Sequence, residues 1–162
     1  MVELVRCARA PGAPLSNEDE KMTGIPKISE AANLALHAMV WLARPGAPRF
    51  ASAAQIAAAL GVSESHLGKV LQRLARNEVD DLIVSTRGAR GGFALARPAR
   101  GINLLEIIEA VDGPLTGIGC LLGTPICGRG SCALTALLDE AVEKLRAGLS
   151  GTNLSDFAAP QR

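Results

Sequence analysis

The sequence has few aromatic residues, little net charge and no long apolar segment. Of its 162 residues only 2% are aromatic, with one tryptophan, three phenylalanines and no tyrosine. Recognition of nucleic acid by rows of stacked aromatic rings is therefore not expected. The formal net charge is +1. Any surface for nucleic acid must therefore be local, because the molecule as a whole has no basic field.

No membrane-spanning or secretory segment is expected. The longest apolar run, at residues 34–43, has about ten residues, whereas a spanning helix needs roughly 20. Arg6 and Arg9 near the N-terminus are not followed by a continuous apolar stretch, which argues against a signal peptide. We expect a cytoplasmic protein without membrane contact, whose cysteines bind metal or react rather than form disulfides.

Helical periodicity begins after residues 1–26, which are expected to form a disordered or variable tail. Apolar residues at helical spacing predict a first helix from about residue 31 to residue 42. Ser52 and Ser63 are good N-cap residues for two further helices, and Gly61 ends the first of these. Two helices joined by a short turn containing glycine are typical of a DNA-binding helix-turn-helix.

Two short segments rich in β-branched and apolar residues follow, at residues 82–86 and 93–96, with glycines between them. They predict a β-hairpin, and a hairpin directly after a helix-turn-helix is a wing. Asn103 then opens a short helix, which Gly113 and the following proline end.

Cysteine clusters in one place. Cys120, Cys127 and Cys132 fall within thirteen residues, and the loop at residues 117–132 that contains them also holds five glycines. A glycine-rich loop with three thiolates can wrap one metal centre, and soft thiolates suit an iron–sulfur cluster or zinc. Three unremarkable thiols in a loop are the remaining alternative, and Cys7 is expected to be a free thiol.

The segment after the cysteines predicts a long amphipathic helix, because its apolar positions follow i, i+3, i+4, i+7 spacing. Few elements remain to cover this face, so a second subunit is expected there. The predicted fold class is mainly α with a small β wing, in which a winged helix-turn-helix is followed by a long C-terminal dimerisation helix. Its parts are the N-terminal tail (1–26), the winged helix-turn-helix (27–100), a connecting helix (101–116), the cysteine loop (117–132), the dimerisation helix (133–150) and a C-terminal tail (151–162).

A local excess of positive charge favours DNA binding. Residues 63–100 hold seven basic and four acidic side chains, a balance of +3. Polar residues near the start of the second helix can reach base edges in a major groove, and arginines beside glycines in the wing can approach phosphates or a minor groove. The candidate DNA contacts are Ser63, Ser65, His66, Lys69, Arg73, Arg87 and Arg90. A plain helical bundle with solvated charges is the alternative.

Taken in order, these motifs resemble the IscR/NsrR/RirA (Rrf-two) family of bacterial winged-helix regulators, from Lys27 to about Ala158. The segments that carry the resemblance are residues 27–43, 56–63, 85–98 and 102–113, followed by the three-cysteine loop. The resemblance implies a homodimer that crosses its C-terminal helices and binds palindromic double-stranded operators. In many members it also implies a 2Fe–2S or 4Fe–4S cluster, whose gain, loss or redox change alters DNA affinity.

The resemblance also bears on the fourth cluster ligand. Some members place a ligand histidine three residues after the third cysteine, where this chain has Thr135. In some relatives, residues at the positions of Asn33 and His37 complete the cluster, in some cases from the opposite subunit. Because a neutral imidazole is a good iron ligand and a carboxamide a weak one, His37 is the expected ligand, with Asn33 nearby or ligating weakly. A helix histidine with a satisfied hydrogen bond is the alternative.

The sequence therefore predicts a dimeric transcriptional regulator, a repressor, that senses redox, nitric oxide or iron and cluster status. An enzyme with cysteine nucleophiles has no support, because no Ser/His/Asp set, phosphate loop or paired-carboxylate motif is present. A zinc-stabilised or thiol-switched DNA-binding regulator without a cluster is the alternative reading.

Overall fold

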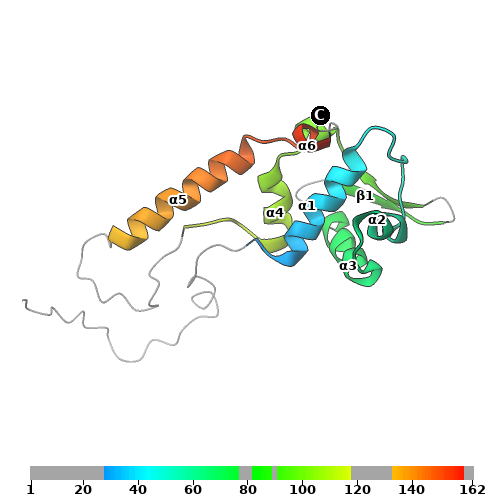
Figure 1. Cartoon of the computed structure of the whole chain (residues 1–162), viewed down its shortest axis with the longest axis horizontal. Helices are drawn as coiled ribbons and strands as arrows, with labels where there is room; N and C mark the ends of the chain where they lie inside the picture. Colours follow the sequence, from blue (N-terminus) through cyan, green and yellow to red (C-terminus); the bar gives the residue numbers. More distant parts are fainter. Residues whose placement is uncertain (1–27, 77–81, 89–90, 118–132, 159–162) are drawn as a thin grey trace, which may run out of the picture. The chain divides into compact units, whose positions relative to one another are not determined.

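The described residues of the computed structural model are 28–76, 82–88, 91–117 and 133–158. They are the coloured ribbon in Figure 1, and they divide into two units. The larger unit lies within residues 28–114 and 146–158. The smaller unit consists of residues 115–117 and 133–145, so the helix α5 (Ala133–Ser150) contributes to both.

Helix α1 (Glu30–Ala43) lies against several other helices of the larger unit. It begins at Ser29, whose side chain accepts a hydrogen bond from the Ala32 N–H. Ala32, Ala35 and Ala38 are fully buried, and such small side chains let neighbouring helices approach closely. Figure 1 shows α1 running between α3 and α4, the helices against which it packs most.

The helix-turn-helix consists of α2 (Ala53–Leu60) and α3 (Glu64–Ala75). A capping box begins α2, because the Ser52 hydroxyl accepts from the Gln55 N–H and the Gln55 side chain accepts from the Ser52 N–H. Gly61 ends α2 at a φ of +68°, as predicted. Ser63 is the N-cap residue of α3, but its hydroxyl pairs with the Ser65 hydroxyl at 3.0 Å and makes no cap hydrogen bond.

The wing is an antiparallel hairpin of β1 (Ile83–Thr86) and β2 (Gly92–Leu95). Two backbone hydrogen bonds join Phe93 of β2 to Ala51, in the link between α1 and α2, at 2.8 and 3.0 Å. Gly92 has a φ of +149°, and a Cβ there would lie 2.4 Å from the Ala51 carbonyl oxygen. Only glycine therefore fits where the wing is attached to the helices. The predicted fold class, mainly helical with a small wing, is confirmed.

Helix α4 (Leu104–Asp112) follows a short 3-10 helix, η2 (Ala99–Gly101), and begins at the predicted cap, Asn103. Two of its carboxylates bind other elements. Asp112 accepts hydrogen bonds from the Ser29 N–H at 2.8 Å and from the Ser29 hydroxyl at 2.5 Å. Glu109 forms an ion pair with Arg146 of α5 at 2.7 Å. These bonds connect α4 to the start of α1 and to the last turns of α5.

Residues 151–158, the first part of the predicted C-terminal tail (151–162), contain packed structure. This segment contains the short helix α6 (Ser155–Ala158) and Leu154, which is fully buried. The Leu154 N–H donates to the Ile102 carbonyl at 2.8 Å, so the segment pairs with a stretch about fifty residues away in the chain. Periodicity along the sequence does not show such a pairing. Residues 159–162, like the predicted N-terminal tail, lie outside the described residues.

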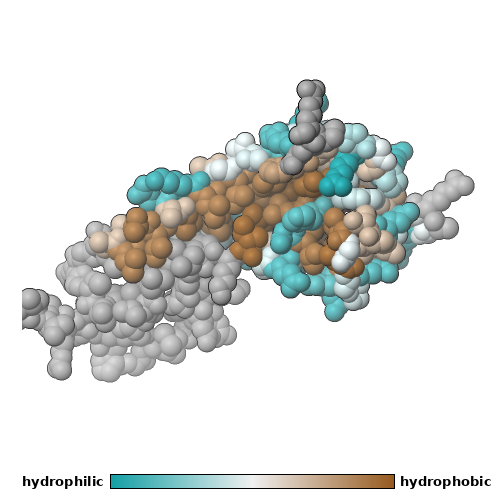
Figure 2. Space-filling view, in the orientation of Figure 1, coloured by the Kyte–Doolittle hydropathy of each residue, from teal (hydrophilic) through white to brown (hydrophobic). Residues whose placement is uncertain are grey.

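Helix α5 has the predicted bounds and exposes much of its apolar face. Val142 is its one buried residue. Leu134, Leu137 and Leu145 are 50%, 63% and 42% exposed, and Figure 2 shows apolar residues along this helix. In the part of the chain that is described, no helix is long and apolar enough to cross a membrane.

Candidate DNA-binding surface and metal ligands

One face of α3 is buried and the opposite face is polar and exposed. Leu67, Val70, Leu71 and Leu74 pack into the core. At 3.6 residues per turn, the residues opposite this stripe point outward together. They are Ser65, Lys69, Gln72 and Arg76, with His66 and Arg73 on one side, and all six are exposed.

The positive charges on this face are not neutralised within the described structure. The side chains of Lys69, Arg73 and Arg76 form no ion pair or hydrogen bond with any residue that the structure describes. Lys69 and Arg76 are seven residues apart, or about 10 Å along the helix axis. Three uncompensated cations over this length create a local field that attracts an anionic partner, although the whole chain carries only +1.

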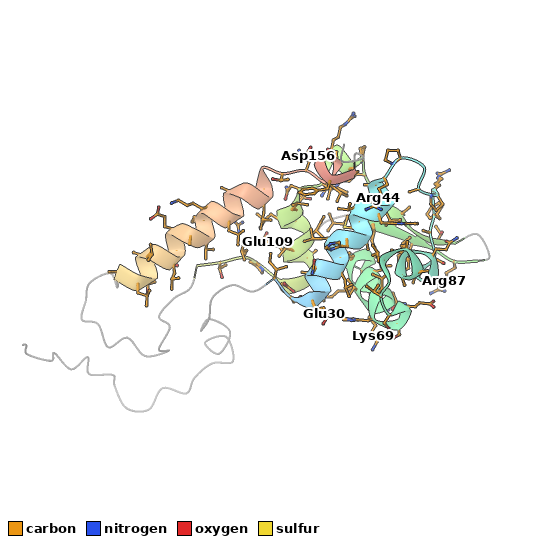
Figure 3. All side chains as sticks on the ribbon, viewed as in Figure 1. Glu30, Arg44, Lys69, Arg87, Glu109 and Asp156 are labelled. Atoms are coloured by element: carbon orange, nitrogen blue, oxygen red, sulfur yellow. The ribbon has the colours of Figure 1, made fainter. Side chains whose placement is uncertain are left out.

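A hollow lies on each side of this face. On the side of α4, a hollow of about 530 Å³ is lined by Lys69, Gln72, Arg73, Arg76 and Ala110. On the side of the wing, a hollow of about 320 Å³ is lined by Gln72, Ala75, Arg76, Ser85, Thr86, Arg87 and Phe93. The exposed face of α3 is therefore continuous with the wing. Figure 3 labels Lys69 on α3 and Arg87 near the wing, both at the lower right of the molecule in this view.

The wing presents Arg87 directly after β1, with its side chain exposed. The turn beyond it is closed by a hydrogen bond from the Gly91 N–H to the Gly88 carbonyl at 2.9 Å. A Cβ on Gly91 would lie 2.3 Å from the Thr86 carbonyl oxygen, so the chain needs glycine here. Arg90, the second predicted wing contact, lies outside the described residues.

His37 and Asn33 both lie exposed on α1, one turn apart. The His37 Nδ1 atom lies 2.8 Å from the backbone carbonyl oxygen of Asn33. A carbonyl oxygen only accepts hydrogen bonds, so Nδ1 carries the proton and donates it. In the neutral ring, Nε2 is then the atom with a free lone pair. A metal-bound histidine usually donates a hydrogen bond from its other ring nitrogen to a carbonyl or carboxylate oxygen, which fixes the orientation of the ring. The satisfied hydrogen bond and the ligand role are thus compatible.

The predicted cysteine ligands, Cys120, Cys127 and Cys132, lie outside the described residues. Within the described ranges, no group of three histidine, cysteine, aspartate or glutamate side chains is placed to hold a metal ion. Of the predicted ligand set, the structure therefore describes only the two positions on α1.

Sequence reasoning missed Gln72 and Arg76, which line both hollows. They follow Lys69 by three and seven residues, so helical spacing places them on its face. The prediction concentrated on the first turns of the helix and stopped at Arg73.

Comparison with known proteins gives a consistent result. Residues 28–160 match the model of the Rrf2 family, described as an iron-dependent transcriptional regulator. A candidate helix-turn-helix transcriptional regulator of Mycobacterium tuberculosis strain H37Rv is 32% identical over 133 residues, covering 82% of this chain and 81% of the relative.

Solved structures agree with this match. CymR of B. subtilis, titled the global cysteine regulator, has a TM-score of 0.69 and 26% identity, and the similarity covers 85% of this chain and 99% of CymR. CymR of Staphylococcus aureus gives 0.66 and 27%, covering 83% and 99%. IscR of T. potens shares the fold, with a TM-score of 0.59 at 24% identity over 81% of this chain and 85% of IscR.

Proposed function

The chain belongs to the Rrf2 family, whose members are transcriptional regulators rather than enzymes, and we propose that it controls transcription through an iron–sulfur cluster that changes its affinity for operator DNA. The observation that carries the DNA-binding part is the continuous exposed surface from α3 to the wing, whose cationic side chains have no ion-pair partner among the described residues. The cluster part rests on the three closely spaced cysteines and on the family's description as iron-dependent.

The DNA contacts divide by position. The first turn of α3 enters the major groove, where short polar side chains and an imidazole can reach base edges. Cationic side chains farther along the helix and in the wing bind phosphates or the adjacent minor groove. The proposed base contacts are Ser63, Ser65, His66 and Lys69, and the proposed phosphate or minor-groove contacts are Arg73, Arg87 and Arg90.

A second copy of the chain covers the exposed apolar face of α5. Leu134, Leu137 and Leu145 are each more than 40% exposed, and a homodimer removes such surface from water. A two-fold dimer also presents two recognition helices to the two halves of a palindromic operator.

The cluster is held by Cys120, Cys127 and Cys132, with His37 as the fourth ligand and Asn33 beside it. The donor chemistry fits, because thiolates and a neutral imidazole are established ligands of iron–sulfur centres. The hydrogen bond from Nδ1 to the Asn33 carbonyl fixes the ring so that Nε2 is the available donor. The cluster would supply a centre whose gain, loss or change of oxidation state follows redox, nitric oxide or iron status. The proposed direction of control is repression.

A zinc-stabilised or thiol-switched regulator is the second candidate. It is favoured by the similarity to two CymR structures, one of them titled as a global cysteine regulator. In this case the same three cysteines would bind zinc or change their own redox state.

Anaerobic purification separates the two candidates. The cluster proposal predicts a brown protein that contains iron and acid-labile sulfide and shows charge-transfer absorption. In Cys132→Ser, the iron and sulfide content and this absorption should be lower or absent. A colourless protein with stoichiometric zinc, or with no metal, contradicts the cluster and supports the second candidate. His37→Ala tests the fourth ligand, because a spectrum, redox potential and cluster lifetime equal to wild type exclude it.

DNA binding is tested separately by salt titration. In the double variant Arg87→Ala, Arg90→Ala, each lost phosphate contact lowers the slope of log affinity against log salt by about 0.9. An unchanged slope and affinity would remove the wing from the interface.

A further inference from the structure

Gln72 is an uncharged polar residue on the exposed face of α3. It lines both the hollow beside α4 and the hollow beside the wing, so it lies between them, in the middle of the exposed face. Lys69 precedes it by three residues and Arg76 follows it by four, so a cation stands about one turn away on either side. A neutral carboxamide thus sits at the centre of a cationic surface.

The Gln72 side chain is also available for a ligand. It is exposed and has no hydrogen bond to any residue that the structure describes. A carboxamide offers two donors and one acceptor with two lone pairs. This is the pattern that pairs in two places with the N6 and N7 atoms of adenine in the major groove, whereas a phosphate oxygen would use only its donors.

Arg76 is the C-cap residue of α3 and lines the same two hollows as Gln72. Ser85 and Thr86 of β1 line the same wing-side hollow, which has a volume of about 320 Å³. Guanidinium and hydroxyl groups, such as those of these three residues, can donate hydrogen bonds to phosphate oxygens. If α3 occupies the major groove and the wing reaches the adjacent minor groove, one sugar–phosphate strand lies between the two grooves. This strand must then pass between α3 and the hairpin.

We propose that Gln72 is a base-reading residue that selects an A·T pair, and that Arg76 anchors the neighbouring backbone phosphate in the hollow between α3 and β1. This inference rests on the proposed DNA binding and extends the interface into the second half of α3. It separates specificity from affinity, because a carboxamide contact to a base depends on sequence and an arginine contact to phosphate does not.

The test is selection of binding sites from a pool of random DNA duplexes, followed by affinity measurements across a salt series. The proteins compared are wild type, Gln72→Ala, Gln72→Met, Arg76→Ala and the control Arg44→Ala. Gln72→Met keeps the length of the side chain without its hydrogen-bonding groups, and alanine and methionine both favour helix, so folding is preserved. Arg44 is an exposed arginine at the end of α1, distant from Lys69 in Figure 3.

Both Gln72 variants should bind the wild-type site about 5- to 150-fold more weakly, and one A·T position of the selected site should become degenerate. Their salt dependence should not change. Arg76→Ala should select the same sequence as wild type but lose about 0.9 from the slope of log affinity against log salt. Arg44→Ala should match wild type in both respects.

Gln72 variants that select the wild-type sequence, or lose affinity for all sequences equally, overturn the base-reading role. An unchanged salt slope in Arg76→Ala overturns the phosphate anchor. If wild type itself selects no sequence, the proposed function fails and this inference fails with it. A wild type that selects a site, with unaltered variants, overturns only the inference.

Discussion

The winged helix-turn-helix and the first part of α5 use the same apolar residues in opposite ways. Leu71 of α3 is fully buried, whereas Leu137 of α5 is 63% exposed. In the larger unit, helices, wing and the segment around Leu154 share one hydrophobic core. Among the described residues of α5, Val142 alone is buried. The larger unit therefore completes its core within one chain, while α5 exposes the apolar surface on which the proposed homodimer rests.

The largest expected effect tests the first half of this comparison. Leu71→Ala removes a fully buried side chain from the core and should lower the free energy of unfolding by about 2–5 kcal/mol, at every protein concentration. Leu137→Ala is the matched control, because the same change at an exposed site should alter unfolding only at protein concentrations at which the dimer is populated. Chemical denaturation followed by circular dichroism measures both. Equal losses for the two variants would contradict the difference between the regions.

Gly92→Ala tests how firmly the wing belongs to the self-contained core. The added Cβ meets the Ala51 carbonyl oxygen at 2.4 Å, at a φ of +149° that L-residues rarely adopt. The loss of stability should be about 2–4 kcal/mol, with weaker DNA binding because the hairpin shifts. Gly101→Ala is the control, since nothing lies within 4 Å of a Cβ there. A Gly92→Ala protein as stable as Gly101→Ala would show that the wing is not held in this way.

Leu137→Ser tests the second half of the comparison. If the exposed face of α5 is buried in a homodimer, the loss of this side chain should cost about 1.5–3 kcal/mol of association free energy. The dimer dissociation constant should therefore rise about 10- to 150-fold, as measured by analytical ultracentrifugation. Glu143→Ala, an exposed polar position on the same helix, should leave it unchanged. An unaltered dissociation constant in Leu137→Ser would place the dimer interface elsewhere.

The smallest expected effect concerns the junction of α1 and α4. Ser29→Ala removes the cap hydrogen bond to the Ala32 N–H and the hydroxyl bond to Asp112, which should cost about 0.5–2 kcal/mol in thermal or chemical unfolding. Ser63→Ala is the matched control, because Ser63 stands at the N-cap of α3 without making a cap bond. Its free energy of unfolding should stay within about 0.5 kcal/mol of wild type. A larger loss for Ser63→Ala than for Ser29→Ala would contradict the observed capping.

Local signals in the sequence predicted most of the larger unit. Ser52, Gly61 and Asn103 stand at the helix ends expected of them, because a cap acts on backbone groups within a few residues. Long-range contacts gave no such signal. The Leu154 side chain is buried in the core, and its backbone N–H donates a hydrogen bond to the Ile102 carbonyl. A short segment with one leucine does not show this pairing in its own sequence pattern.

The candidate DNA-binding surface could likewise be predicted in part from local signals in the sequence. Burial of one stripe of α3 makes the opposite residues exposed, and the candidate contacts Ser65, His66, Lys69 and Arg73 are all exposed, while their contact with DNA stays a prediction. Gln72 and Arg76 gained their significance only from the hollows on either side of the helix, which depend on where α4 and the wing lie. Cluster ligation by His37 stays a prediction, now with the Nδ1 hydrogen bond that supports it.

The central claim is that a cluster bound by the cysteines controls DNA affinity. Its most direct test is the affinity of one selected operator for the anaerobically reconstituted protein and for the cluster-free protein, at the same salt concentration. The account predicts that the two affinities differ by about 5- to 150-fold, the range of a coupling free energy of about 1–3 kcal/mol. Equal affinities for the operator, with and without the cluster, would contradict it.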